Sequence, residues 1–314
     1  MRYSLFTIII FAILLVSGCS GPAADTPLKT REQAIPAGAV KMTPEMDDHP
    51  PILHSDEFEE PVPFDAVNTA GGEDSPFMAV DRDEFYFFFT PDVSIPAEKQ
   101  VIDGVTGIYV SKRQNGVWSK PERVMLEKPG KAVLDGCEFV QGNTIWFCTA
   151  REGYAGIHWF SAEFKDGVWK DWKESDFKPE YEVGELHFST DWNEVYFHSA
   201  RAGGKTGLDI WSSKKVDGEW SEPVNIGIVN SPDNEGWPYL SSDGKELWFL
   251  RFYKGSPAIF RSKLADGQWG EPELIVETFA GEPTIDGEGN LYFVHHYYKD
   301  GKMIEADIYV AEHK

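Results

Sequence analysis

Short alternations of apolar and polar residues recur along this chain at a nearly constant interval. Strands are expected at residues 107–112, 156–161, 209–214 and 258–263, which read GIYVSK, GIHWFS, DIWSSK and AIFRSK. Each strand is followed by an Asn-Gly or Asp-Gly pair, which favours a tight hairpin turn, and then by a tryptophan. These tryptophans (Trp118, Trp169, Trp220, Trp269) are 51, 51 and 49 residues apart. The pattern predicts a repeat of about 50 residues built from hairpins.

Each repeat also opens with a hairpin, as at residues 236–250 and 283–294. Every repeat then contains four short antiparallel strands, and no helical period is present. Four-stranded repeats of this length predict an all-β fold, a five-bladed β-propeller over residues 58–314. A β-sandwich of irregular hairpins is the alternative, but it does not explain the regular tryptophans. The five opening hairpins begin near Ser75, Gly136, Gly184, Glu235 and Gly281.

The fifth repeat stops before its last strand. Residues 307–314 match the third strand of the repeat at Asp209, and the chain then ends without a tryptophan strand. Residues 58–62 near the beginning, FEEPV, match WSEPV at residues 220–224. We therefore expect this N-terminal strand to complete the last blade, which removes an open sheet edge.

The first residues have the layout of a signal peptide, expected over residues 1–18. Arg2 precedes an apolar run at residues 5–16, and Ser17, Gly18 and Cys19 follow. This resembles the cleavage site of bacterial lipoproteins, so Cys19 is the predicted lipidation site and the protein is expected in the cell envelope. The alternative is ordinary secretory cleavage, with Cys19 uninvolved. Residues 19–57 contain scattered prolines and no apolar period, which predicts a flexible tether.

The charge of the chain argues against nucleic acid as a partner. The formal net charge is −23, and loss of Arg2 with the leader would make it −24. Phosphate backbones would be repelled by such a surface. Residues 19–314 contain no further apolar stretch long enough for a transmembrane helix, so the predicted membrane contact is through lipid alone.

The two remaining cysteines flank a predicted hairpin. If the chain turns at Gly142-Asn143 in a two-residue loop, Cys137 lies directly opposite Cys148. Residues so opposed have Cα atoms about 4.5–5.5 Å apart, which suits a disulfide. Export permits the bond, whereas a three-residue loop would break this register.

The third and fourth repeats resemble a known family. Residues 208–227 and 235–251, with Asp-Ile-Trp, Ser-x-Asp-Gly-Lys and Trp-x-x-Pro, are similar to the WD40-like PD40 repeats of TolB-type propellers. The second repeat departs from this pattern, since Gln141-Gly142-Asn143 replaces the Asp-Gly turn and Trp172 replaces the proline. The first carries an insertion at residues 91–105. The resemblance implies an exported protein that binds another macromolecule of the envelope, and little about chemistry.

Charged residues recur where the first and second strands of each repeat are expected. In a propeller the first strand lines the central channel, where ligands commonly bind. The candidates are Glu138, Glu185, Glu235 and Glu282, with Glu73 in the first blade, and Arg151, Arg201, Arg251 and His295 after the second strands. One interpretation is a ring of carboxylates neutralised by arginines, because unpaired buried charges are unfavourable. The other is a ligand-binding site.

We expect a binding or scaffolding module that holds an envelope protein, peptide or glycan at this channel face. The alternative is a carbohydrate-active hydrolase, which would use two of the glutamates as acid and base. Catalytic acids commonly differ between blades, however, and these glutamates recur with the repeat. Glu185, His187 and His198 could together bind zinc if the hairpin placed the two histidines opposite each other. We predict no catalytic residue, no metal site and no cofactor.

Overall fold

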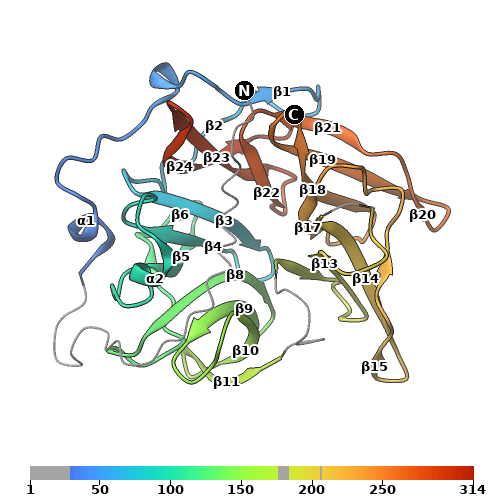
Figure 1. The fold of residues 1–314 in the computed structure, drawn as a ribbon, viewed down its shortest axis with the longest axis horizontal. Helices are drawn as coiled ribbons and strands as arrows, with labels where there is room; N and C mark the ends of the chain where they lie inside the picture. The colour runs from blue at the N-terminus through green and yellow to red at the C-terminus, as the bar shows by residue number, and fades with distance from the viewer. Residues whose placement is uncertain (1–28, 176–183, 206) are drawn as a thin grey trace. The chain divides into compact units, whose positions relative to one another are not determined.

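The computed structural model describes residues 29–175, 184–205 and 207–314, which are folded into two compact units. Compact unit 1 contains the described residues up to Asp48, residues 63–175 and residues 296–308. Compact unit 2 contains residues 49–62, the described residues from 184 to 295, and residues 309–314. Both are built from β-strands (Figure 1). The described helices are short: α1 (Arg31–Ala34), η1 (Pro44–Met46) and α2 (Ala97–Gln100).

Compact unit 1 holds the first two repeats. The first consists of β3 (Gly72–Ala79), β4 (Glu84–Thr90) and β5 (Gly107–Gln114), with the two short strands β6 (Val117–Trp118) and β7 (Glu122–Arg123) pairing with β5. The second consists of β8 (Val133–Gln141), β9 (Thr144–Arg151), β10 (His158–Lys165) and β11 (Val168–Glu174). Neighbouring strands within each repeat are antiparallel.

Compact unit 2 holds the next two repeats. The third consists of β12 (Leu186–Phe188), β13 (Glu194–Ser199), β14 (Asp209–Val216), β15 (Glu219–Trp220) and β16 (Val224–Asn225). The fourth consists of β17 (Glu235–Leu240), β18 (Glu246–Tyr253), β19 (Ser256–Ala265), β20 (Gln268–Trp269) and β21 (Glu273–Glu277), and β1 (Ile52–Leu53) pairs with β21.

The fifth repeat contributes to both units. β22 (Ala280–Ile285) pairs with the first part of β23 (Leu291–Lys299) in compact unit 2. In compact unit 1, β24 (Lys302–Ala311) pairs with β3 through Ala306 and Gly72, and this pair is parallel. The prediction of an all-β fold of repeated antiparallel hairpins is confirmed.

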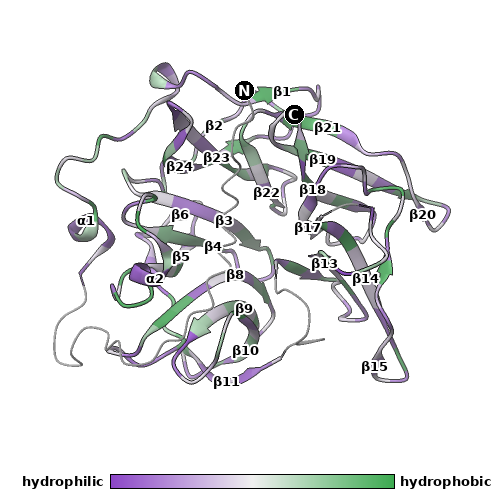
Figure 2. Cartoon of the chain, in the orientation of Figure 1, coloured by the Kyte–Doolittle hydropathy of each residue, from purple (hydrophilic) through white to green (hydrophobic). Residues whose placement is uncertain are grey.

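Burial within a repeat decreases from the inner strands to the outer ones. Nearly every residue of β4 is buried, whereas β11 is half-buried or exposed along its whole length. The hydropathy follows the same order, with β4 and β13 mostly apolar and β11 hydrophilic (Figure 2). In the third and fourth repeats the core includes Leu247, Phe249 and Ile210. The apolar residues of the inner strands therefore form the core.

A proline decides whether the outer strand is continuous. Pro121, Pro223 and Pro272 each lie between two short strand pieces, because proline has no N–H for the ladder. In the second repeat Trp172 occupies this position, and β11 runs unbroken from Val168 to Glu174. The repeat that departs most from the family pattern therefore has the most regular outer strand.

Residues 57–64 run antiparallel to the end of the chain. In compact unit 2, Phe58 bridges His313, and the Lys314 N–H donates to the Glu57 carbonyl. In compact unit 1, the Phe64 N–H donates to the carbonyl of Ile308. This is the pairing expected of an N-terminal strand that completes the last repeat.

The expected flexible tether over residues 19–57 is wrong from Arg31 onward. The Arg31 side chain is buried, Lys41 bonds to Glu305 and Asp307, and β1 extends the sheet of the fourth repeat. Scattered prolines and the lack of an apolar period indicate that a segment has little regular secondary structure. They do not exclude that single side chains attach such a segment to the folded protein. Cys19 and the predicted signal peptide lie outside the described residues. None of the described helices is long and apolar enough to span a membrane.

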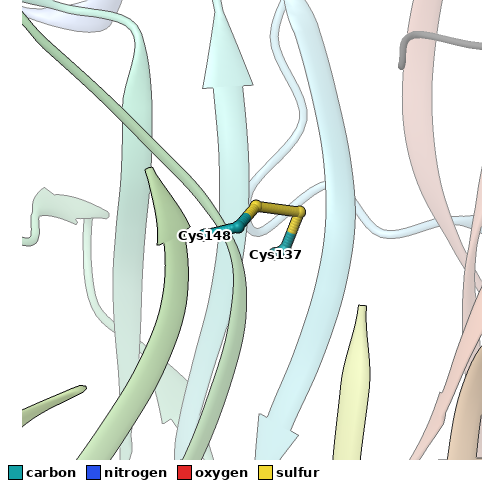
Figure 3. The surroundings of a disulfide bond; sticks show 2 residues. All are labelled: Cys137 and Cys148. Atoms are coloured by element: carbon teal, nitrogen blue, oxygen red, sulfur yellow. A yellow bond between two sulfur atoms is a disulfide. The ribbon is translucent and has the colours of Figure 1, made fainter. Parts of the chain in front are cut away.

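Cys137 and Cys148 form a disulfide that joins β8 to β9 (Figure 3). Their Cα atoms are 5.4 Å apart. The predicted register holds from Gln141 opposite Thr144 as far as Phe139 opposite Trp146, and then shifts by one residue. Gly136, rather than Cys137, therefore lies opposite Cys148, and the extra residue still leaves the two sulfur atoms within bonding reach.

The buried Phe58 provides a test of the N-terminal strand. Its ring packs against Trp248 and His313, with centroids 6.1 and 5.6 Å away. Phe58→Ala should lower the free energy of unfolding by about 3–5 kcal/mol, the usual loss for a large core side chain. Urea unfolding measures this loss, with the exposed Val62→Ala as control. Equal losses for the two variants would contradict the assignment.

Candidate functional site

The first strands of four repeats carry the same irregularity, a one-residue β-bulge. Each bulge holds one residue with positive φ: Ser75 (48°), Cys137 (53°), Trp237 (51°) and Glu282 (55°). Left-handed backbone is unfavourable for residues with a side chain, and bulges redirect side chains. The bulge therefore defines a common reference position in these strands.

This reference separates the predicted glutamates into different positions. Glu73 and Glu235 lie two residues before the bulge residue, whereas Glu282 is itself the bulge residue. In β8 the position two residues before the bulge is Asp135, and Glu138 follows the bulge. The expectation of one ring of equivalent glutamates is therefore wrong. The spacing of the repeats in the sequence did not reveal which residue of each first strand forms the bulge.

Glu235 forms a buried ion pair with Arg251 in the fourth repeat. The two residues are directly opposite in β17 and β18, and Arg251 Nε lies 2.7 Å from Glu235 Oε1. The Ser231 hydroxyl donates to the same oxygen, and Arg251 Nη2 donates to the Val229 carbonyl at 2.6 Å. The guanidinium carbon is 4.5 Å from the centre of the Phe260 ring. Burial raises the pKa of Glu235, and Ser231 and Arg251 act against that rise.

The first repeat has the same arrangement, but its arginine comes from the N-terminal segment. Arg31 Nη1 lies 3.1 Å from Glu73 Oε1 and 2.8 Å from the Val67 carbonyl oxygen. The Thr69 hydroxyl donates to Glu73 as Ser231 does to Glu235. The guanidinium carbon stands 5.1, 5.2 and 5.5 Å from the ring centres of Phe87, Phe89 and Tyr109.

The turns that precede these two glutamates are also the same. Asn68 brackets the backbone of Ile308, accepting from its N–H and donating to its carbonyl, and Asn230 does the same to Ile210. Residues 64–73 and 226–235 are therefore two copies of one local structure. In the first copy Phe89 lies opposite Glu73, where the fourth repeat has Arg251. Because position 89 holds phenylalanine and not arginine, the counter-charge of Glu73 has to come from another part of the chain. This was the one signal of that contact in the sequence.

Lys41 supplies a second cation from the N-terminal segment. Its ammonium group contacts Asp307 and lies 2.7 Å from Glu305 Oε1, and the Met42 N–H donates to Glu305 Oε2 at 3.0 Å. Burial raises the pKa of Asp307 to about 8 and that of Glu73 to about 7, although Lys41 and Arg31 counteract the rise. Sequence reasoning missed Arg31, Lys41, Glu305 and Asp307. Of these four residues, only Asp307 could have been found from the sequence, because it aligns with Asp209 in the third strand of another repeat.

Arg151 pairs with Asp135 and not with the predicted Glu138. Arg151 Nη2 lies 2.9 Å from Asp135 Oδ1, and its side chain is only 1% exposed. The guanidinium carbon is 4.4 Å from the centre of the Trp172 ring, the residue that replaces proline in this repeat. Asp135 is the equivalent of Glu235, which the Gly136 and Gly236 that follow them indicate in the sequence.

The other predicted residues have different surroundings. Arg201 Nε donates to the Ser199 hydroxyl at 3.1 Å, and its guanidinium carbon is 4.7 Å from the centre of the Phe197 ring. His295 is fully buried, opposite Ala280, with its ring 5.2 Å from that of Tyr309. Glu138 and Glu282 are buried, and Glu185 is half-buried just before β12.

The two histidines of the third repeat do not face each other. His187 lies opposite Tyr196, and His198 lies opposite Ile210. His198 Nδ1 instead accepts the N–H of Trp237, the bulge residue of the next repeat, at 3.1 Å. The condition for the zinc alternative at Glu185, His187 and His198, that the two histidines lie opposite each other, is therefore not met. Among the described residues no group of three or more His, Cys, Asp or Glu side chains could hold a metal ion.

His198 occupies a position that is apolar in other repeats. A Cβ at Gly136 would be 3.2 Å from Phe88, and one at Gly281 would be 2.6 Å from Leu250. His198 packs in the same way against Gly236, 3.0 Å from such a Cβ. A histidine in an apolar position becomes hard to protonate, and burial lowers the pKa of His198 to about 4 and that of His187 to about 3.

Comparison with known proteins does not establish a family. No protein-family model and no curated protein matches the chain. Similar solved structures include TolB from Acinetobacter baumannii (12% identity, TM-score 0.42, covering 79% of this chain and 56% of that one). They also include the gluconolactonase XC5397 from Xanthomonas campestris (12% identity, TM-score 0.48, covering 88% of this chain and 98% of that one). A third is an alpha-L-arabinofuranosidase from Lactobacillus brevis (10% identity, TM-score 0.48, covering 79% of this chain and 92% of that one). This chain thus spans just over half the length of that TolB chain, and the likenesses assign no function. The PD40 resemblance stays a prediction.

The buried His198 predicts a pH-dependent difference in stability. Because its folded pKa is lowered, its contribution is present above pH 6.5 and is lost as the pH falls toward 4. His198→Leu, which introduces the residue found at position 250, should gain stability relative to the wild type by about 1.4 kcal/mol per pH unit over that range. Urea unfolding at several pH values measures the difference, with the exposed His49→Leu as control. A difference that does not change with pH would show that His198 is protonated in the fold.

Proposed function

We propose that this protein is an exported lipoprotein whose five repeats close into a five-bladed propeller, and that it binds or scaffolds an envelope protein or peptide. One observation carries the choice of binding over catalysis. Glu73, Asp135 and Glu235 each lie within 3.1 Å of an arginine nitrogen. A hydrolase needs an acid and a base that exchange protons with substrate, and carboxylates held in ion pairs are poorly suited to that exchange.

The proposal of a closed ring rests on the pairing of residues 57–59 with residues 312–314. This pairing gives the last strand of the chain a neighbour, as expected if the N-terminal strand supplies the missing outer strand. The count of five blades rests on the five opening hairpins of the sequence.

The ligand-binding residues that we propose are the bulge residues of the first strands. Trp237 and Glu282 hold left-handed backbone, which costs free energy and is often found at functional sites. Trp237 is only partly buried, and its ring centre lies 4.8 Å from that of His198, with the two ring planes tilted by 42°. An aromatic ring and a carboxylate at equivalent bulge positions suit a peptide or protein segment that combines apolar and basic groups. A glycan is the alternative ligand.

The export proposal makes Cys19 the residue that holds the protein on a membrane. It rests on the apolar run at residues 5–16 and the small residues before Cys19. Cys19→Ala should move the protein from the membrane fraction to the soluble fraction of the source cells. Immunoblots of fractionated cells measure this, with Ser20→Ala as control. Retention of Cys19→Ala in the membrane would contradict the lipid anchor.

The binding proposal predicts separate results for ligand capture and hydrolysis. Wild-type residues 20–314, tested on arrays of peptides and of envelope glycans, should bind peptides and should release nothing from nitrophenyl glycosides. Trp237→Ala should weaken binding at least tenfold, because it removes the aromatic platform. Trp220→Ala, on an outer strand, should bind like the wild type. Glycoside turnover that Glu282→Gln abolishes would replace binding with the hydrolase alternative.

A further inference from the structure

The first repeat has a carboxylate at a position where three other first strands have glycine. The residue directly before the bulge is glycine in the second, fourth and fifth repeats (Gly136, Gly236 and Gly281). A Cβ at these glycines would lie 2.6–3.2 Å from a side chain of the preceding repeat. In the first repeat this residue is Asp74, which precedes the bulge residue Ser75 in β3. The first repeat therefore departs from the others at one defined position.

The Asp74 carboxylate has one oxygen occupied and one open. Oδ1 accepts the N–H of Ser75 at 2.9 Å. Oδ2 accepts no hydrogen bond from the described residues, and His296 Nε2, 3.8 Å away, is too distant for one. The two side chains are partly exposed, Asp74 by 17% and His296 by 13%. Solvent, and with it a small cationic group, therefore reaches this pair.

Asp74 also lacks the cation that the neighbouring carboxylates have. Glu73, Glu305 and Asp307, which are buried in β3 and β24, each contact an arginine or a lysine of the N-terminal segment. Asp74 forms no ion pair with a lysine or an arginine of the described residues, and His296 compensates its charge only when protonated. A partly buried carboxylate without a counter-charge is unfavourable, so this position favours an added cation.

Two aromatic side chains of compact unit 1 border the pair. Phe88 of β4 lies directly opposite Asp74, so the two side chains are on the same face of the sheet. Tyr298 follows His296 by two residues in β23, and both rings are half-buried. Burial and then the charge of Asp74 raise the pKa of Tyr298, so its phenol lies near that carboxylate. These surroundings suit a cation carried on an apolar stem.

We propose that Asp74 and His296 bind a primary ammonium group, that of a lysine side chain in the ligand. One nitrogen can lie within hydrogen-bond distance of both Asp74 Oδ2 and His296 Nε2, because their separation of 3.8 Å is less than twice that distance. The ammonium donates to both atoms, and the neutral imidazole then has its proton on Nδ1. The methylene stem of the lysine packs beside Phe88 and Tyr298.

An arginine side chain fits this position less well. A guanidinium pairs best with both oxygens of a carboxylate, and Asp74 Oδ1 is already held by the Ser75 N–H. The inference rests on the proposed function, because it names the group of a peptide or protein ligand that compact unit 1 binds. No residue of this site belongs to the site proposed around Trp237.

The test is a titration of the full chain, purified in detergent, with small capped probes. Nα-acetyl-lysine methylamide should shift the NMR signal of His296 in histidine-labelled protein. Nα-acetyl-norleucine methylamide, which lacks the ammonium group, should bind at least tenfold more weakly. The corresponding arginine probe should also bind more weakly than the lysine probe. Glycine methylamide has an α-ammonium group without a stem, represents a peptide N-terminus, and should bind more weakly as well.

Substitutions of Asp74 test the site itself. Asp74→Gly introduces the residue of the other first strands, and Asp74→Asn keeps an acceptor for the Ser75 N–H without the charge. Both should weaken binding of the lysine probe at least tenfold, and melting curves should show that both are folded. Asp65→Asn, at an exposed position of the same unit, removes the same charge and should bind like the wild type.

The remaining outcomes separate the alternatives. Absence of binding by the wild type, or unchanged binding by a folded Asp74→Asn, would overturn the site. Tighter binding of the arginine or the glycine probe would overturn the choice of a lysine side chain. Trp237→Ala should bind the lysine probe like the wild type. Lack of peptide capture on the arrays together with normal binding of the lysine probe would therefore contradict the proposed function and not this site.

Discussion

A cation held over aromatic rings and paired with a buried carboxylate is the interaction on which the inner strands of this protein depend. A carboxylate taken out of water loses several kcal/mol of hydration, and the first strands of three repeats bury one that is paired with an arginine. Arg31, Arg151 and Arg251 compensate that loss at 2.7–3.1 Å. Their guanidinium groups also lie over aromatic rings of the second and third strands. One group thus links three strands and fixes their register.

The cation lies at the same position in each of these repeats, but the segment of the chain that supplies it differs. In the fourth repeat the arginine is on the second strand, whereas in the first repeat it is the first residue of α1, about forty residues upstream of Glu73. This explains why a proline-rich segment is part of the fold, and why its composition alone was a poor guide. One or two buried side chains are enough to attach an irregular segment to the folded protein.

Most of the fold could be predicted from the sequence, since hairpin turns and alternating strands are local signals. The departures from that prediction have local causes as well. Prolines divided three outer strands, and bulges at Ser75, Cys137, Trp237 and Glu282 changed the residue that occupies each inner position. A bulge leaves no mark in an apolar–polar pattern, so Glu138 was assigned a role that Asp135 has. The roles of Arg31 and Lys41 could not be predicted, because contacts between residues far apart in the sequence leave no periodic pattern.

The most direct test is to move the cation of the first repeat to the place it has in the fourth. Arg31→Ala leaves Glu73 buried without its counter-charge, and this should cost about 3–5 kcal/mol. Phe89→Arg puts an arginine opposite Glu73, as Arg251 is opposite Glu235. Urea unfolding of Arg31→Ala with and without Phe89→Arg is the measurement. If the account is correct, the double variant recovers most of the lost stability; a double variant no more stable than Arg31→Ala alone would contradict it.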